Sequence, residues 1–171
     1  MKIFLDCSDV DLIKQSFASG LIDGVTTNPS LMLKNGQDPL KVLKEITSIF
    51  PWDASISAEV VGDTVEDMLA MADTYLEIAP NITIKVPCTR TGLKACKDLA
   101  EDDVAVNVTL IFSAAQAILA SKAGATYVSP FIGRLNDQYW DGISLVEEIS
   151  DVFTTHGSKT QVLAASIREP I

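Results

Sequence analysis

Seven short runs rich in β-branched residues recur along the chain, and the first six are each followed by a stretch with helical patterning. The runs lie at residues 2–6, 24–27, 55–60, 82–87, 104–111, 126–131 and 161–166. Helices are predicted at residues 8–19, 38–50, 64–79, 91–101, 113–124 and 142–157, with Ser8 and Thr64 as N-caps and Gly124 and Gly157 as left-handed C-terminal caps. Strands separated by helices form a parallel sheet with covered faces. The alternation therefore predicts an α/β protein.

Two folds accommodate this pattern, a closed barrel and an open, doubly wound sheet. The sequence LDCSDVD, residues 5–11, stands where a glycine-rich nucleotide-binding loop would follow the first strand, and no Walker motif occurs. We therefore expect a TIM (β/α)8-type barrel. Because 171 residues are fewer than the roughly 250 of a complete barrel, we expect a single domain, residues 1–171, truncated after the seventh strand and lacking helix 7, strand 8 and helix 8.

The charge of the chain argues against nucleic acid as a partner. The formal net charge is −10, and the Lys and Arg residues form no cluster. No apolar stretch reaches the length of a membrane span, and the first residues do not have the pattern of a signal peptide. We expect a cytoplasmic protein that binds neither nucleic acid nor membrane.

The cysteines and the histidine offer no metal site. Cys7, Cys88 and Cys96 are odd in number and lack the spacing of metal ligands, which favours free thiols in a reducing compartment. His156 follows a predicted helix and receives no functional role. The sequence therefore predicts no bound metal.

Polar residues lie near the C-terminal end of every predicted strand, which is where barrels of this type place their chemistry. In chain order they are Asp6, Thr26, Thr27, Asn28, Glu59, Lys85, Asn107, Thr109, Ser129, Arg134, Ser166 and Arg168. This distribution favours one shared site.

Lys85 stands inside the apolar run ITIKVP, residues 82–87. If Lys85 points into a barrel, burial favours the uncharged amine, which can form a Schiff base with a ketone. The alternative is structural, with the lysine reaching solvent at an edge strand or pairing with a buried carboxylate. The run alone leaves both interpretations open.

The carboxylates also admit two interpretations. Taken singly, Asp6 and Glu59 are a helix cap and an ion-pair partner. Around one amine, two carboxylates and the hydroxyl of Thr109 could move the protons that imine chemistry requires.

Three residues near the last two strands could bind a phosphate. Arg134, Ser166 and Arg168 offer guanidinium groups and a hydroxyl, which suit a phosphate, although arginines in loops are usually solvated.

Six ordered segments resemble the small transaldolases and their relatives, the fructose 6-phosphate aldolases. The segments are FLDCSDV, GVTTNPSLM, IKVPCTRTGLKA, NVTLIFSAAQA, AGATYVSPFIGRL and VLAASIREP, at residues 4–10, 24–32, 84–95, 107–117, 123–135 and 162–170. The resemblance covers essentially the whole chain. It implies a (β/α)8 barrel that uses no metal or organic cofactor and acts on small sugar phosphates.

The resemblance also implies roles for individual residues. Lys85 corresponds to the Schiff-base lysine and Asp6 to the acid–base group of carbon–carbon cleavage, while Glu59 and Thr109 correspond to the pair that holds the catalytic water. The residues implied to contact the substrate or its phosphate are Thr27, Asn28, Asn107, Ser129, Phe131, Arg134, Ser166 and Arg168.

Two positions distinguish the branches of the family. The aldolases carry glutamine at the position of Glu59 and tyrosine at that of Phe131, whereas this chain has the pair of the transaldolases. The resemblance thus implies transfer of a dihydroxyacetone unit from sedoheptulose 7-phosphate to glyceraldehyde 3-phosphate, giving erythrose 4-phosphate and fructose 6-phosphate. The alternatives are a fructose 6-phosphate aldolase and an inactive, truncated fragment that binds sugar phosphates. A homo-oligomer is also implied, although the terminal helix that joins subunits in the family is absent here.

Overall fold

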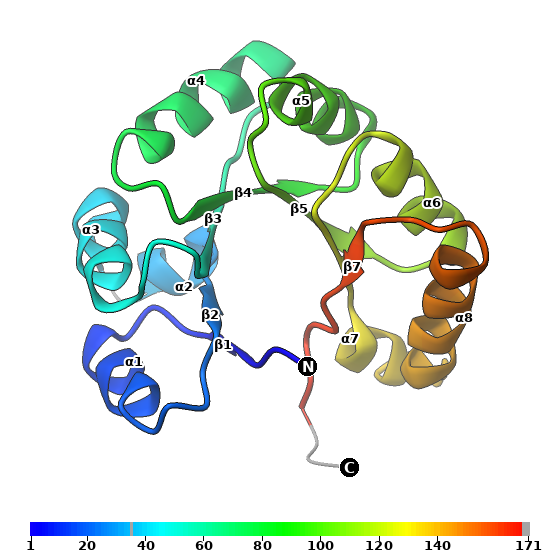
Figure 1. Cartoon of the computed structure of the whole chain (residues 1–171), viewed down its shortest axis with the longest axis horizontal. Coiled ribbons are helices and arrows are strands. Elements are labelled where there is room, and N and C mark those ends of the chain that lie inside the picture. The colour runs from blue at the N-terminus through cyan, green and yellow to red at the C-terminus, as the bar shows by residue number, and fades with distance from the viewer. Residues whose placement is uncertain (35, 169–171) are drawn as a thin grey trace. The chain divides into compact units, whose positions relative to one another are not determined.

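The computed structural model describes residues 1–34 and 36–168, and strands and helices alternate along them (Figure 1). The strands are β1 Phe4–Asp6, β2 Gly24–Thr26, β3 Ser55–Glu59, β4 Ile82–Pro87, β5 Val106–Ile111, β6 Tyr127–Pro130 and β7 Gln161–Val162. The helices are α1 Val10–Phe17, α2 Pro29–Lys34, α3 Pro39–Ile49, α4 Val65–Leu76, α5 Arg90–Glu101, α6 Ala114–Lys122, α7 Ile132–Asn136 and α8 Gly142–Thr155. Glu169 and Pro170, which end the last of the six motifs, lie outside the described residues.

The chain divides into two compact units. Unit 1 comprises Met1–Gly62 and Glu66–Ile84, and unit 2 comprises Asp63–Val65 and Lys85–Ile171. The division falls within β4, so that the first half of this strand belongs to unit 1 and the second half to unit 2. Whether residues 1–171 behave as a single domain stays a prediction.

In unit 1 the strands are parallel and aligned so that polar residues meet across the sheet. In register, Asp6 of β1 pairs with Thr26 of β2, and Thr26 pairs with Ser57 of β3. The start of β4 lies beside β3, because the buried hydroxyls of Ser55 and Thr83 are hydrogen-bonded at 2.7 Å. The fully buried side chains of this unit include Ile13, Val25, Ile46, Ile56 and Ile84.

In unit 2 the strands are parallel as well. The Cys88 N–H at the end of β4 donates to the Thr109 carbonyl of β5 at 2.9 Å. In register, Asn107 of β5 pairs with Tyr127 of β6, and Tyr127 pairs with Gln161 of β7. The fully buried side chains here include Val86, Val106, Val108, Ile111 and Ile149.

Strand order within each unit confirms the barrel-type α/β fold. The order follows the chain, β1-β2-β3-β4 in unit 1 and β4-β5-β6-β7 in unit 2. A doubly wound sheet instead reverses its order at a switch point, which places the third or fourth strand beside the first. Sequential parallel strands joined through helices are the pattern of the TIM (β/α)8 barrel, of which the described residues contribute seven strands.

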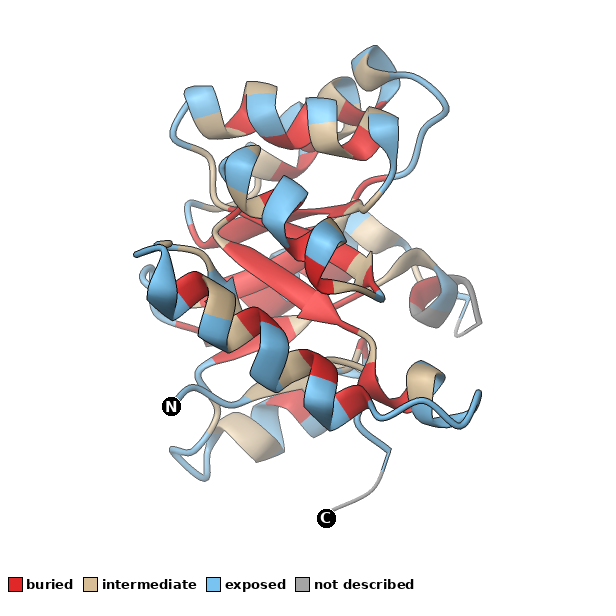
Figure 2. Ribbon diagram, turned by 90° about the vertical axis from the view of Figure 1, so that its right-hand side faces the viewer, coloured by how far each residue is buried: buried red, intermediate tan, exposed pale blue. Residues whose placement is uncertain are grey.

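Alternation along the strands sends polar and apolar side chains to opposite faces of the sheet. In β3, Ser55, Ser57 and Glu59 alternate with the buried Ile56 and Ala58. The strands β2 to β6 are mostly buried, β1 and β7 are intermediate or exposed, and the long helices have one buried and one exposed side (Figure 2). A sheet face that carries buried polar groups is unusual for a purely structural core, and it points to a site.

Several local predictions are confirmed and one is wrong. Gly124 and Gly157 adopt left-handed conformations after α6 and α8, with φ of 94° and 62°. Ser8 is not the cap of α1; Asp9 is, because its carboxylate accepts the backbone N–H groups of Asp11 and Leu12 and is better placed than the preceding hydroxyl.

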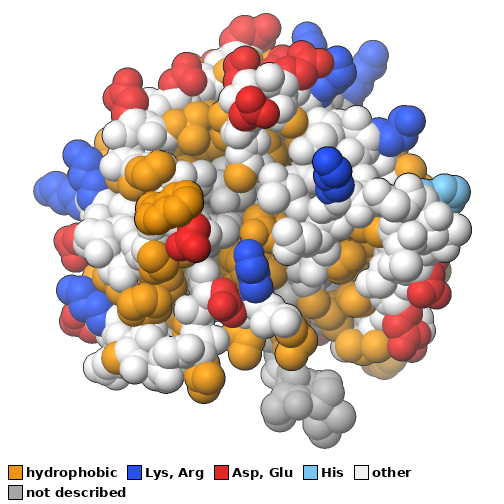
Figure 3. Space-filling model, viewed as in Figure 1, with side chains coloured by type: hydrophobic (Ala, Val, Ile, Leu, Met, Phe, Trp, Pro, Cys, Tyr) orange, Lys and Arg blue, Asp and Glu red, His pale blue; other side chains and the backbone are white. Residues whose placement is uncertain are grey.

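Further findings concern short elements and two side chains. The sequence did not indicate α2 or α7, and β7 is only two residues long, although Ala165 still pairs with Phe131 beyond it. The cap predicted at Thr64 stays a prediction. His156 is exposed, as expected for the end of α8 (pale blue in Figure 3).

Candidate active site

In unit 1 the ends of β1 and β2 bring Asp6 and Thr26 together. The Thr26 hydroxyl donates to Asp6 Oδ1 at 2.8 Å. Position 24 must be glycine for these strands to pack, because a Cβ there would lie 2.5 Å from the Ser55 carbonyl oxygen and 2.6 Å from the ring of Phe4. The Asp6 carboxylate is exposed, so it can reach a bound ligand while Thr26 fixes one of its oxygens.

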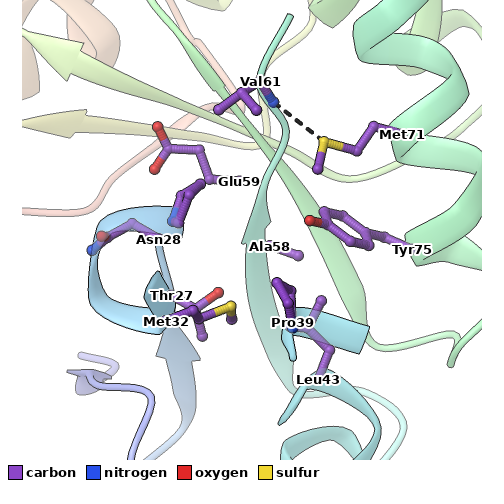
Figure 4. A pocket seen from close by; sticks show the side chains of 11 residues that line it. Thr27, Asn28, Met32, Pro39, Leu43, Ala58, Glu59, Val61, Met71 and Tyr75 are labelled. Carbon is purple, nitrogen blue, oxygen red and sulfur yellow. Dashed lines mark hydrogen bonds between the residues drawn. The ribbon is translucent and has the colours of Figure 1, made fainter. Parts of the chain in front are cut away.

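The residues after β2 and at the end of β3 line a cavity of unit 1 (Figure 4). The side chains of Asn28 and Glu59 lie on the same side of β3 in that view, whereas the buried hydroxyl of Thr27 donates to the Ser57 carbonyl at 2.9 Å. Thr27 thus joins β2 to β3. A substrate contact of Thr27 stays a prediction.

In unit 2 the decisive feature is Lys85. Its side chain is only 6% exposed, within a strand whose neighbouring residues Ile84 and Val86 are fully buried. Among Lys and Arg residues whose side chains the structure describes, Lys85 alone is buried. The alternative of a lysine that extends to solvent from an edge strand therefore does not apply, and a buried lysine is suited to nucleophilic chemistry.

The next strand, β5, contains an irregularity beside Thr109. Between Val108 and Ile111 the register of β5 against β6 shifts, and Leu110 adopts a left-handed φ of 61°. Bulges of this kind often lie next to active sites, where they redirect a side chain. The Thr109 hydroxyl is buried, and within the described residues it has no hydrogen-bond partner. A buried hydroxyl without a partner is destabilising, which favours a ligand-directed role for Thr109.

Two further polar residues of unit 2 are hydrogen-bonded to each other. The Ser129 hydroxyl of β6 donates to Asn107 Oδ1 of β5 at 2.8 Å, and both side chains are buried. This bond fixes the orientation of the Asn107 amide.

An aromatic pair supports Arg134. The Arg134 guanidinium carbon lies 4.7 Å from the centre of the Phe131 ring, and the Phe112 ring meets Phe131 edge-on with centroids 5.9 Å apart. A guanidinium over an aromatic face is attracted to it. The pair thus favours one position of an otherwise exposed arginine.

The segment that holds Ser166 and Arg168 passes directly over Gly133. The Gly133 N–H donates to the Ser166 carbonyl at 2.9 Å, and a Cβ at position 133 would lie 2.1 Å from that oxygen and 3.0 Å from Arg168 Nε. Ser166 has a left-handed φ of 56°, which is strained for serine. Arg168 forms an ion pair with Asp137. The structure therefore brings the segment with Ser166 and Arg168 against Gly133, the residue before Arg134; a shared phosphate site of these three residues stays a prediction.

The cysteines and the possible metal ligands add no further site among the described residues. The three cysteines are free, and burial, with a smaller contribution from Cys88, raises the pKa of Cys96 to about 12, so this thiol stays protonated at neutral pH. No group of three or more His, Cys, Asp or Glu side chains in the described part of the chain could hold a metal ion. Nor does any helix within residues 1–34 and 36–168 have the length and apolar character to cross a membrane.

Comparison with known proteins decides the family. A family profile described as Transaldolase/Fructose-6-phosphate aldolase matches residues 3–171. The chain belongs to the transaldolase/fructose-6-phosphate aldolase family. Relatives named "Probable transaldolase" occur in Paracoccus denitrificans (53% identity over 98% of this chain and 76% of the relative), Methanococcus maripaludis (52% over 100% and 79%) and Shouchella clausii (50% over 100% and 78%).

Two neighbours of the predicted residues were not identified from the sequence: Phe112, which supports Phe131, and Asp137, which pairs with Arg168. Thr26, which holds Asp6, was among the polar residues at the strand ends, but its bond to Asp6 was not predicted. The contacts of Phe112 and Asp137 depend on how loops return to the sheet, which periodicity does not describe.

Proposed function

We propose that this protein is a transaldolase, which moves a dihydroxyacetone unit from a ketose phosphate to an aldose phosphate through a Schiff base on Lys85. The observation that carries this proposal is the burial of the Lys85 side chain in the middle of an apolar strand. Family membership and the names of the relatives support the reaction class.

In the proposed reaction, the Lys85 amine adds to the C2 ketone of the substrate, and loss of water gives the imine. Asp6 accepts the proton of the C4 hydroxyl as the C3–C4 bond breaks, which releases an aldose phosphate and leaves an enamine on Lys85. The enamine carbon then attacks the aldehyde of the acceptor, and Asp6 returns the proton. Hydrolysis of the new imine frees the product ketose and restores the amine.

The other residues take supporting roles in this proposal. Glu59 and the Thr109 hydroxyl hold the water that enters and leaves during imine formation and hydrolysis, a role that suits the absence of any protein partner for Thr109 within the described residues. Asn28, Asn107 and Ser129 contact the hydroxyls of the substrate. Arg134, Ser166 and Arg168 bind its phosphate by charge-assisted hydrogen bonds.

The second candidate, a fructose 6-phosphate aldolase, differs in the fate of the enamine. An aldolase protonates it and releases dihydroxyacetone. Phe131 has no proton to donate, and its face is covered by Arg134 at 4.7 Å. Transfer should therefore exceed release.

The test compares the two activities directly. Fructose 6-phosphate is supplied with and without erythrose 4-phosphate, and transfer product and free dihydroxyacetone are measured. We expect transfer to exceed release, and Phe131→Tyr, which adds a proton donor at that position, to increase release relative to transfer. If the unmutated protein releases dihydroxyacetone as fast as it transfers it, the protein is an aldolase; if it does neither, the proposed function fails.

A further inference from the structure

Unit 1 contains a cavity of about 130 Å3 between β3 and the helices α2, α3 and α4 (Figure 4). Most of its lining is apolar. The side chains that form the apolar wall include Met32, Leu43, Ala58, Val61 and Met71. Among the described residues that line it there is no Lys or Arg, so this lining is not suited to a sugar phosphate.

One polar group is directed into this cavity without a partner. Tyr75 of α4 is only 5% exposed, and its hydroxyl points toward Ala58 of β3 (Figure 4). Over the described residues the hydroxyl makes no hydrogen bond, and burial raises the pKa of Tyr75. Buried tyrosine hydroxyls usually find a partner. Here the uncharged O–H is left available to something inside the cavity.

Other polar groups of the wall are already engaged. The Thr27 hydroxyl donates to the Ser57 carbonyl at 2.9 Å, and the Val61 N–H donates to Met71 Sδ at 3.4 Å. A buried water needs two to four polar partners, whereas an apolar cavity of similar size can stay dry and bind benzene. The side of this cavity formed by Met32, Leu43, Ala58, Met71 and Tyr75, with the Tyr75 hydroxyl as its polar group, therefore suits an organic ring better than water.

We propose that this cavity binds a small, uncharged aromatic molecule with one hydrogen-bonding substituent, of the size and chemistry of phenol. The ring packs against Met32, Leu43 and Met71, and the substituent oxygen accepts the hydrogen of the Tyr75 hydroxyl. Glu59 also lines the cavity, and its negative charge disfavours an anion at this place, although its carboxylate points away from Tyr75 (Figure 4).

This binding site differs from the proposed sugar-phosphate site in its chemistry, and it shares two residues with that site. Asn28 and Glu59 line the cavity and also belong to the proposed catalytic set. A molecule bound in the cavity would therefore restrict the conformations of the Glu59 side chain. We expect saturating phenol to change the rate at which the dihydroxyacetone unit is transferred. That kinetic expectation rests on the proposed function, whereas the binding does not.

The experiment titrates the 171-residue protein with phenol and, separately, with benzene, and measures heat or ligand-observed NMR signals. We expect saturable binding of both compounds with one site per chain. Tyr75→Phe should weaken phenol binding about 3- to 10-fold, the effect of losing one neutral hydrogen bond, and leave benzene binding nearly unchanged. Tyr139→Phe is the matched control, because Tyr139 is fully exposed and its hydroxyl should not matter.

A second variant locates the site independently of Tyr75. Ala58→Val adds two methyl groups to the wall of the cavity and should abolish binding of both compounds, with circular dichroism to confirm the fold. The proposal is overturned if neither compound binds saturably, or if Tyr75→Phe weakens phenol and benzene equally. It is also overturned if Tyr75→Phe has no effect on phenol.

Discussion

Removing the hydroxyl of Thr109 should stabilise the protein, whereas the same change at Thr83 should destabilise it. Both threonines lie in strands and are buried, with exposed fractions of 1% and 2%. Thr83 shares a 2.7 Å hydrogen bond with the buried hydroxyl of Ser55. The hydroxyl of Thr109, in contrast, has no partner among the residues that the structure describes.

The magnitudes follow from this difference in hydrogen bonding. Valine has nearly the shape of threonine, so the substitutions change polarity and leave the packing almost intact. A buried polar group without a partner costs about 1–3 kcal/mol, so Thr109→Val should raise the free energy of unfolding by roughly 1 kcal/mol. Thr83→Val leaves the Ser55 hydroxyl without its partner and should lower the free energy of unfolding by about 1–3 kcal/mol. The two variants therefore differ in stability by about 2–4 kcal/mol, which for a chain of 171 residues corresponds to a difference in Tm of about 4–16 °C.

The assay is urea unfolding of the two variants and the unmutated protein, followed by circular dichroism at pH 7. The activity of Thr109→Val provides the second measurement: we expect imine formation to slow in the more stable protein, because the proposed water-holding hydroxyl is gone. If Thr109→Val loses as much stability as Thr83→Val, the Thr109 hydroxyl has a structural partner and its proposed role in holding water is wrong.

Two further predictions concern the phosphate residues and a helix cap. Arg134→Ala should raise KM for phosphorylated substrates about 10- to 100-fold and change KM for dihydroxyacetone little, because a charge-assisted contact with the phosphate is lost. The control is Arg90→Ala, since Arg90 is exposed. Equal effects on both substrates would remove Arg134 from the phosphate site. Asp141 caps α8, and its hydrogen bonds with the Ser144 hydroxyl and N–H hold the pKa of its carboxyl below the usual 3.8. Asp141→Ala should therefore lower Tm at pH 7, and the difference from the unmutated protein should shrink as the pH falls through this lowered pKa; a difference that persists in acid would contradict the cap.

The fold was predictable because its strands and helices have different periodicities. Apolar residues alternate with polar ones in β3, and they recur every three or four positions in α3, where Val42, Leu43 and Ile46 are buried. The same sequence did not decide between a barrel and an open sheet on pattern alone. That choice depends on which strands pair. The answer comes from β4, which lies beside β3 and not beside β1, as it would in a doubly wound sheet.

The site was predictable in its residue types but not in its contacts. A lysine in an apolar strand is visible in the sequence, and the burial of Lys85 agrees with that interpretation. The bulge that sets Leu110 in a left-handed conformation has no signal, because leucine is among the residues least expected there. The approach of Ser166 to Gly133 is equally hidden, since the two residues are far apart in the chain and meet only through tertiary packing.

The most direct test of the central claim is to trap the imine and find the residue that carries it. The protein is incubated with fructose 6-phosphate, reduced with borohydride, digested and analysed by mass spectrometry, with Lys85→Met and the exposed Lys94→Met as paired variants. We predict an added mass on the peptide that contains Lys85, unchanged in Lys94→Met and absent in Lys85→Met. A label on any other lysine, or a label that survives in Lys85→Met, would contradict the assignment.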